Sequence, residues 1–281
     1  MLGAAIVCPG HKEVIPVMPE PIFKQDGQNK NDCERNAWKR FLPKFREDHP
    51  HLRAIALLDA LYANAPVIRD LRRALFSWII RAKPDGNPFL FQQVQQMSDQ
   101  SLTEEFEAVA SDGVHRRYRL AWNVPLNESN AEVRVDFLEV WEPRFPDGQQ
   151  HFAFILDPLL SLSPDRAEAF MWGGRSRGKI ENETFNTLKN QGYQFEHNFG
   201  HGHHNLSVVL AMLMMLAFLV DQTQQLCCPL FAAAWEECKS KRAFWERLRE
   251  IFHQFQVKSM QAIYEAVLSI GKPPLKVLWD S

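Results

Sequence analysis

The chain has 281 residues, of which 46% are hydrophobic and 11% aromatic, so it is not a disordered chain and can hold one large domain or a domain with an insertion. Its formal net charge is −2, so overall charge does not predict a nucleic-acid binder, and any DNA contact must come from local basic clusters. The five cysteines include no C-x-x-C pair, which argues against a disulfide framework or a cysteine-rich zinc site and favours a reducing compartment.

Strands and helices alternate through the first third of the sequence. The short apolar run 54–58 is typical of a strand buried in a parallel sheet, and it ends at Asp59. Asn64 is expected to cap the following helix, with Leu71 and Leu75 on its buried face. The elements expected here are a hairpin over 4–17, a helix over 32–45, the strand over 54–58, the Asn64 helix, a strand over 76–82 and a helix over 88–97.

The remaining sequence predicts an extended block followed by helices. Residues 104–156 contain four extended segments, which we interpret as an antiparallel β insertion in an α/β domain. After Pro164 the pattern is helical, with expected helices over 179–190, 205–225, 235–255 and 257–270. The apolar run 206–220 is shorter than the roughly 20 residues that a membrane-spanning helix needs, so we expect a fully buried core helix.

Asp59 is the first candidate for a functional side chain. It stands at the carboxyl end of the expected parallel strand, the sheet edge at which open α/β proteins bind ligands. The simpler alternative is a cap of the turn or helix that follows the strand.

Glu181 is the second candidate. Arg177 and Glu181 are four residues apart, so a helix would place them on one face. A surface ion pair worth a few tenths of a kcal/mol is the ordinary alternative. If Asp59 and Glu181 met, their oxygens would suit Mg²⁺, and two such ions about 3.5–4 Å apart catalyse phosphoryl transfer on DNA.

Two long runs carry a resemblance to a known family. Residues 180–193, IENETFNTLKNQGY, and residues 196–202, EHNFGHG, resemble the C-terminal signature of insertion-sequence DDE transposases. Shorter family-like text occurs at 26–27, 32–37, 59–62 and 82–84. The resemblance implies an RNase H-like core with a β insertion, and a DDE triad that binds two divalent metal ions, Mg²⁺ or Mn²⁺.

The resemblance also assigns roles to individual residues. Carried over by position, Asp59 is the second acid and Glu181 the third, with Glu183 as the fallback. Asp59 and Glu181 would then be catalytic and would bind the metal ions. Four basic residues would contact DNA: Arg177, Lys179, Lys189 and Lys83.

The implied function is strand cleavage and transfer at insertion-sequence ends. The family carries its first aspartate on a strand that precedes the equivalent of residues 4–17, so we expect an N-terminally truncated chain with impaired activity. Two alternatives are an inactive remnant that binds DNA or an intact copy, and an RNase H-type nuclease.

The same interpretation predicts organisation, partners and location. Residues 1–103 would form the first part of the RNase H-like core, 104–157 the β insertion, 158–225 the second part of the core, and 226–281 a helical C-terminal extension. The expected partners are DNA, both transposon ends and target, and a second copy of the chain, with no membrane. The expected location is the bacterial cytoplasm, at the nucleoid.

A histidine-rich segment leaves one further alternative. His197 and His201 are spaced as zinc ligands on a helix would be, and His203, His204 and Glu196 lie close by in sequence. Gly200 and Gly202 oppose a continuous helix and the spacing matches no structural zinc pattern, so a polar loop is the favoured interpretation.

Overall fold

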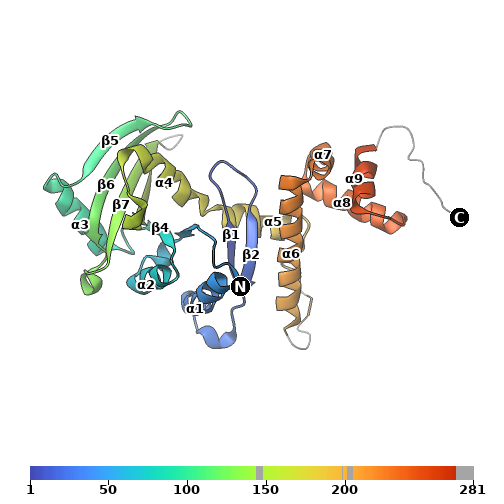
Figure 1. Cartoon of the computed structure of the whole chain (residues 1–281), viewed down its shortest axis with the longest axis horizontal. Helices are drawn as coiled ribbons and strands as arrows, with labels where there is room; N and C mark the ends of the chain where they lie inside the picture. Colours follow the sequence, from blue (N-terminus) through green and yellow to red (C-terminus); the bar gives the residue numbers. More distant parts are fainter. Residues whose placement is uncertain (144–147, 198, 201–204, 270–281) are drawn as a thin grey trace. The chain divides into compact units, whose positions relative to one another are not determined.

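The chain folds into a mixed α/β structure, seen in a computed structural model that describes residues 1–143, 148–197, 199–200 and 205–269 (Figure 1). It divides into two compact units. Unit 1 comprises Met1–Leu2 and Glu20–Gly178, and unit 2 comprises Gly3–Pro19 and Lys179–Ser281.

Unit 1 is built on a six-stranded mixed sheet in the order β3-β4-β8-β7-β6-β5. β3 and β4 are parallel, as predicted, and the other neighbours are antiparallel. The four predicted extended segments are confirmed as β5 to β8, and β8 pairs directly with β4, so they continue the same sheet. The strands are β3 (Ile55–Leu58), β4 (Ser77–Ala82), β5 (Glu104–Val109), β6 (His115–Pro125), β7 (Arg134–Pro143) and β8 (Gln149–Leu156).

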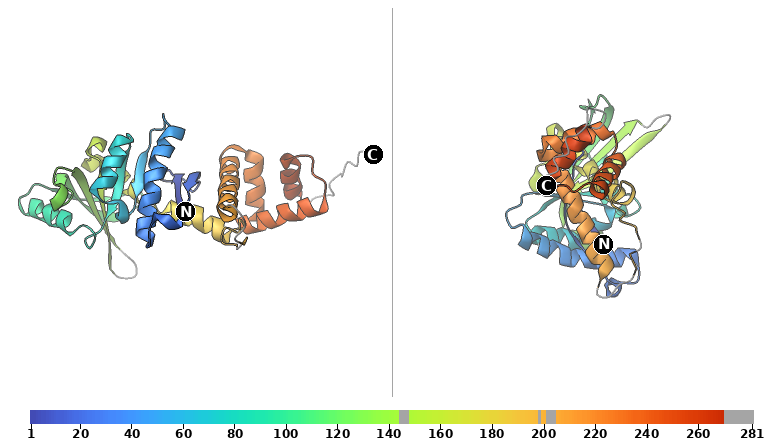
Figure 2. Two further views of the ribbon diagram at one scale, coloured as in Figure 1. Left: turned by 90° about the horizontal axis from the view of Figure 1, so that it is seen from below. Right: turned by 90° about the vertical axis from the view of Figure 1, so that its right-hand side faces the viewer.

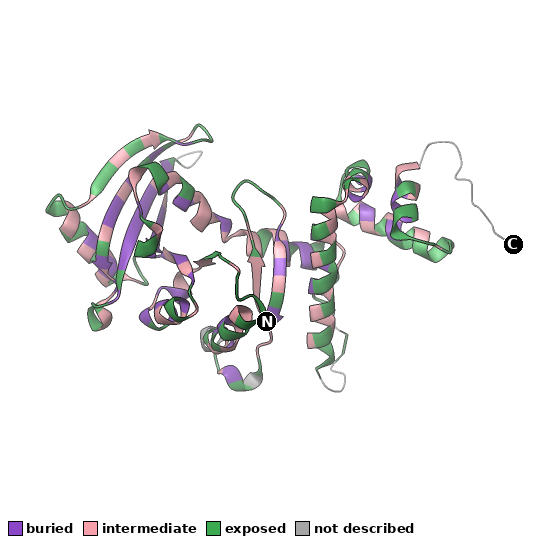
Figure 3. Cartoon of the chain, viewed as in Figure 1, coloured by how far each residue is buried: buried purple, intermediate pink, exposed green. Residues whose placement is uncertain are grey.

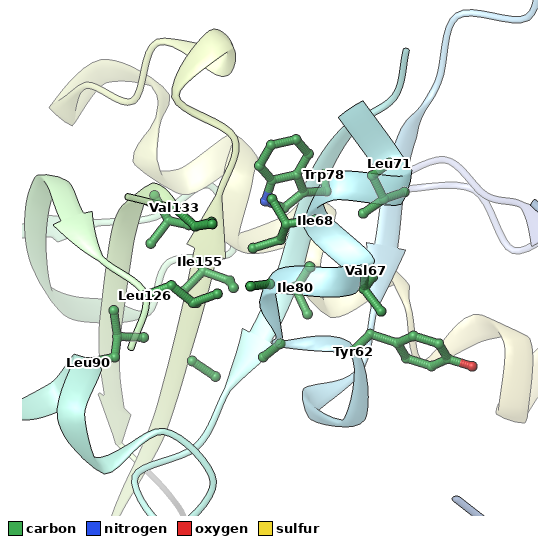
Figure 4. Packing of buried hydrophobic residues seen from close by; sticks show 14 of the residues in the cluster. Tyr62, Val67, Ile68, Leu71, Trp78, Ile80, Leu90, Leu126, Val133 and Ile155 are labelled. Atoms are coloured by element: carbon green, nitrogen blue, oxygen red, sulfur yellow. The ribbon is translucent and has the colours of Figure 1, made fainter. Parts of the chain in front are cut away.

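Helices cover both faces of this sheet. Successive side chains of a strand point to opposite faces, so Ile80 packs with one apolar cluster and Ile79 with the other. The Ile80 cluster, which also takes in Ile68 and Leu90 (Figure 4), faces the first three helices of the unit, and the Ile79 cluster, with Met171, faces the fourth. The helices are α1 (Lys30–Asp48), α2 (Ala65–Arg73), α3 (Pro88–Asp99) and α4 (Pro164–Ser176).

Local signals predicted the start of α2 better than its end. The Asn64 side chain accepts a hydrogen bond from the backbone N–H of Val67 at 3.2 Å, which confirms the predicted cap. Leu71 is fully buried, but the prediction for Leu75 was wrong. The helix ends at Arg73, and Leu75 is exposed with a φ of 56°, because the chain turns there to enter β4.

β3 is less buried than its apolar sequence predicted. It pairs with β4 on one side and forms an edge of the described sheet, and Ile55 is 41% exposed. The predicted strand is therefore confirmed and its predicted full burial was wrong. A continuous apolar run indicates two covered faces but says nothing about neighbours in the plane of the sheet.

Unit 2 places a hairpin on helices from the other end of the chain (Figure 2). The predicted hairpin is confirmed as β1 (Leu2–Ile6) and β2 (Ile15–Glu20). The buried Gln222 side chain accepts a hydrogen bond from the backbone N–H of Val14 at 3.0 Å. A Cβ on Gly3 would lie 2.5 Å from the ring of Phe185, so β1 contacts the helical segment that contains Phe185 closely. That segment is a π-helical stretch, Ile180–Phe185, that continues as α5 (Asn186–Asn190) and precedes α6 (Leu206–Cys227).

The C-terminal helices share a separate aromatic core. Phe231, Phe244 and Tyr264 pack edge-to-face or stacked with ring centroids 5.2–6.3 Å apart. The predicted continuous helix over 235–255 was wrong, because Lys239 has a φ of 58° and Ser240 caps a new helix. The elements are α7 (Pro229–Cys238), α8 (Lys241–Gln254) and α9 (Met260–Ser269).

Helix α6 is not the fully buried helix that its composition predicted. Met215 and Phe218 are buried, but apolar side chains along the rest of its length are exposed (Figure 3). The prediction was wrong because α6 is packed on one side of its circumference within unit 2. Among the described helices, α6 is the one whose length and composition would suit a membrane span.

Candidate functional site

Asp59 terminates β3 and begins the short 3₁₀ turn Ala60–Tyr62. Its Oδ1 accepts a hydrogen bond from the backbone N–H of Leu61 at 3.0 Å, so the capping role considered from the sequence is real. Its Oδ2 is paired with the guanidinium of Arg177 at 3.0 Å. Both side chains remain about one-third exposed, so solvent or a ligand can reach the pair.

Arg177 reaches Asp59 from the end of α4, 118 residues further along the chain. The sequence placed Arg177 on the helix of Glu181, where it would act beside the third acid. In unit 1 it contacts Asp59, the residue to which the resemblance assigns the role of second acid. The tertiary fold thus joins two residues that the resemblance had assigned to different parts of the site.

Glu34 is a second carboxylate near Asp59 that sequence reasoning did not select. It lies on α1, and the Tyr62 hydroxyl donates a hydrogen bond to it at 3.0 Å. Burial, followed by the negative charges of Glu34 and Asp59, raises the pKa of Tyr62. Both carboxylates are therefore within electrostatic reach of one buried hydroxyl. The available signal was Glu34's place in a stretch that resembles the family.

Two further arginines, Arg81 and Arg175, lie near Arg177. Burial, and then the charges of Arg177 and Arg175, lowers the pKa of Arg81 on β4. Arg81 and Arg175 both lie over the ring of Phe152, with 5.1 and 4.7 Å between guanidinium carbon and ring centroid. Clustered guanidinium groups suit phosphate oxygens. Sequence reasoning missed Arg81 because it sits inside an otherwise apolar strand.

The predicted residues of unit 2 occupy different surroundings. Glu181 is exposed in the π-helical stretch, and Glu183 is partly buried. The Lys179 ammonium donates hydrogen bonds to the backbone carbonyls of Cys8, at 2.5 Å, and His11, so it holds the hairpin turn. Lys189 pairs with Glu196 at 2.7 Å on the surface.

Lys83 follows β4 on the surface of unit 1, where its backbone carbonyl closes the turn to α3. Asp59 lies in unit 1 and Glu181 in unit 2, so their convergence on one metal ion stays a prediction. Of the predicted site residues, unit 1 brings Asp59 and Arg177 into contact.

A buried polar cluster in unit 2 was not predicted. The Tyr193 hydroxyl donates a hydrogen bond to Asp221 at 2.5 Å, and burial raises the pKa of Asp221 to about 6. Burial also lowers the pKa of Lys241, against the opposing attraction of Glu183, Glu13 and Asp221. Three carboxylates thus act electrostatically on one partly desolvated ammonium group.

The proposed zinc ligands gain no support from the described residues. His201, His203 and His204 lie outside the part of the chain that the structure describes, and His197 stacks edge-on against Phe199. Within the described ranges, no three His, Cys, Asp or Glu side chains are grouped so that they could hold a metal ion.

No protein-family model matches this sequence, and comparison with curated proteins finds no match.

Proposed function

We propose that the chain is the catalytic core of a DDE-type DNA transposase, which cleaves and transfers DNA strands at insertion-sequence ends. The observation that supports this best is Asp59 at the carboxyl end of a parallel strand, held by Arg177, with Arg81 and Arg175 near that arginine. The proposal includes an RNase H-like core, DNA as partner, and the nucleoid of a bacterial cytoplasm as location.

The proposed metal ligands are Asp59 and Glu181, because Mg²⁺ and Mn²⁺ take carboxylate oxygens. The donor chemistry around Asp59 fits, since Glu34 adds a second carboxylate near the same strand end. Two bound ions would supply charge neutralisation at the attacking and leaving oxygens. Arg177 would exchange part of its contact with Asp59 for a DNA phosphate when metal binds.

Mn²⁺ titration followed by electron paramagnetic resonance tests the metal site independently of catalysis. We expect the chain to bind Mn²⁺ and Asp59→Asn to weaken that binding about tenfold or more, since one anionic ligand is lost. The control is Asp70→Asn, which removes a partly exposed carboxylate on α2 that pairs with Arg73. Equal Mn²⁺ affinity in wild type and Asp59→Asn would contradict the proposal.

DNA cleavage gives the second readout. Divalent-metal-dependent cleavage that yields joined strands, and is lost in Asp59→Asn and in Glu181→Gln, would support transposase chemistry. Cleavage to hydrolysed ends alone would favour the RNase H-type nuclease. Cleavage that persists in both variants would place the chemistry elsewhere in the chain.

One observation favours a second candidate, a protein that binds DNA without transferring strands. Both Asp59 oxygens are already engaged, one by the Leu61 N–H and the other by Arg177. A carboxylate held in this way positions an arginine for phosphate binding. Salt-sensitive DNA affinity without Mn²⁺ binding at Asp59 would select this candidate over the first.

A further inference from the structure

One end of the unit 1 sheet carries the two most exposed large apolar side chains of the part of the chain that the structure describes. Leu75, just before β4, is 86% exposed, and Leu159, shortly after β8, is 84% exposed. The chain segments that carry them meet, because the backbone N–H of Asp157 donates a hydrogen bond to the carbonyl of Trp78 at 3.0 Å. Since β3 and β4 are parallel, this is the end of the sheet opposite to Asp59.

The fold of unit 1 does not account for a leucine at position 75. Its φ is 56°, a left-handed conformation that a bulky side chain rarely adopts and that asparagine or glycine adopts more easily. Its side chain also buries almost none of its apolar surface. A leucine here therefore stabilises neither the local conformation nor the core, whereas a partner that covered it would remove its apolar surface from water.

Two arginines lie directly beside these leucines. Arg46 donates a hydrogen bond to the backbone carbonyl that precedes Leu75, at 2.9 Å, and Arg166 donates one to the carbonyl that follows Leu159, at 2.6 Å. A guanidinium group has five N–H donors, so each arginine keeps donors for a ligand. Both side chains are thus fixed next to an exposed leucine while they retain their positive charge.

Two further arginines extend this positive charge. Arg72 lies within electrostatic reach of the buried Asp157 and donates a hydrogen bond to a backbone carbonyl of β7, and Arg53 is exposed in the loop before β3. Within the described part of the chain, none of the four arginines forms an ion pair with a carboxylate. We call this set the leucine–arginine patch: Leu75, Leu159, Arg46, Arg53, Arg72 and Arg166.

The composition of the patch specifies the chemistry of its partner. Guanidinium groups bind carboxylates through charge-assisted hydrogen bonds, and exposed leucines are covered by other apolar side chains. A protein segment with Asp or Glu beside large apolar residues provides both contacts. Arginine is also enriched at interfaces between proteins.

Two other anionic partners fit the patch less well. The phosphates of DNA would bind the arginines but would leave the two leucines in water. An anionic bilayer favours Trp or Phe next to flexible basic side chains. The patch contains no aromatic residue, and Arg46 and Arg166 are held by backbone carbonyls.

We propose that the leucine–arginine patch binds an acidic, partly apolar segment of another protein. Leu75 and Leu159 supply the apolar contacts, and the four guanidinium groups bind the carboxylates of the partner. The patch and Asp59 lie at opposite ends of β3, so this binding leaves Asp59 accessible. It does not depend on the proposed DNA chemistry.

Selection of phage-displayed random peptides on the immobilised full chain tests the proposal. We expect recovered peptides to carry Asp or Glu next to Leu, Ile, Phe or Trp. Fluorescence anisotropy of a labelled synthetic copy then measures affinity. Leu75→Asn and Leu159→Asn should each weaken binding about tenfold or more, because an apolar contact is lost. Arg53→Gln should weaken it less, and mainly at low salt.

Matched controls separate the patch from a general loss of charge or apolar surface. Leu102→Asn removes a leucine that is 56% exposed before β5, at the opposite edge of the sheet, and should leave peptide affinity unchanged. Arg35→Gln removes an exposed arginine near the start of α1 and should do the same. Asparagine tolerates a positive φ, so Leu75→Asn should unfold in urea at least as late as wild type.

Several results would overturn the proposal. These are failure to recover any peptide that binds the chain, recovered peptides without acidic residues, and equal peptide affinity in wild type and both leucine variants. A different occupant would be identified if Leu75→Asn and Leu159→Asn abolished a dimer in sedimentation equilibrium, weakened binding to phosphatidylserine vesicles, or weakened binding to duplex DNA. Each of those outcomes also contradicts a protein partner of the stated chemistry.

Discussion

At the scale of single residues, several charged side chains of this protein are paired with partners far away in sequence. Asp59 is held by Arg177, and the Arg40 guanidinium spans Glu20 and Asp26, each at 2.6 Å. The hydrogen bonds from Arg40 lower the pKa of Asp26 to about 2. Asp221 shows the opposite case, because burial outweighs its hydrogen bond from Tyr193.

Asp221 should make the stability of unit 2 depend on pH. Its pKa rises from an ordinary value of 3.8 to about 6 on folding, so the folded state favours the protonated form. This stabilisation is fully present below pH 3.8 and is lost as the pH rises through about 6. One pKa unit is worth about 1.4 kcal/mol, so the loss is at most about 3 kcal/mol.

Urea denaturation of wild type and Asp221→Asn at pH 5 and pH 7.5 measures this effect. Asp221→Asn keeps a hydrogen-bond acceptor for Tyr193 but cannot ionise. We expect it to reduce the fall in the free energy of unfolding between the two pH values. Glu246→Gln, which removes an exposed carboxylate on α8, should leave that fall unchanged. An identical fall in wild type and Asp221→Asn would show that Asp221 does not titrate in this range.

At the scale of elements, α4 depends on two adjacent glycines that differ in the space around them. A Cβ on Gly174 would lie 2.5, 2.7 and 2.9 Å from three atoms of the buried Phe154 ring. A Cβ on Gly173 would lie 3.3 Å from the terminal methyl of Ile79, which can move slightly. Of the two glycines, Gly174 thus lies closer to the side chains of the sheet.

These two glycines give a matched pair of substitutions. Alanine is a better helix former than glycine by about 1 kcal/mol, a gain available at both positions. At Gly174 we expect overpacking to reverse that gain, so that Gly174→Ala lowers the free energy of unfolding by about 1–3 kcal/mol. Gly173→Ala should be neutral or slightly stabilising. Thermal or urea unfolding would contradict this account if the two variants behaved alike.

At the scale of the whole molecule, a net charge of −2 means that any DNA affinity must come from a local surface. Arg177, which pairs with Asp59, and the nearby Arg81 and Arg175 are the candidate surface. Binding through phosphates releases counterions, so affinity should fall steeply with salt.

Fluorescence anisotropy with labelled duplex DNA at several salt concentrations measures that dependence. The logarithm of affinity should fall with the logarithm of salt by about 0.9 for each phosphate contact, and Arg177→Ala should reduce the slope by about one contact. Arg73→Ala, which removes an arginine from the exposed surface of α2, should leave the slope unchanged. Affinity indifferent to salt would exclude phosphate recognition by this surface.

The sequence by itself determined the local elements of this protein. Periodicity, turn residues and caps act between residues close in the chain, so the hairpin, the Asn64 cap, the four strands of the extended block and the parallel order of β3 and β4 followed from it. For the candidate site, the position of Asp59 at a strand end also followed, because a strand's last residue is a local property.

Only the tertiary structure decided which distant groups meet and which surfaces stay in contact with water. The Asp59–Arg177 pair, the approach of Glu34 through Tyr62, and the edge position of β3 depend on contacts across many residues. The two faces of α6 differ for the same reason. Residues 208–220 of α6 are apolar on every side of the helix, and burial is decided by what packs against each side.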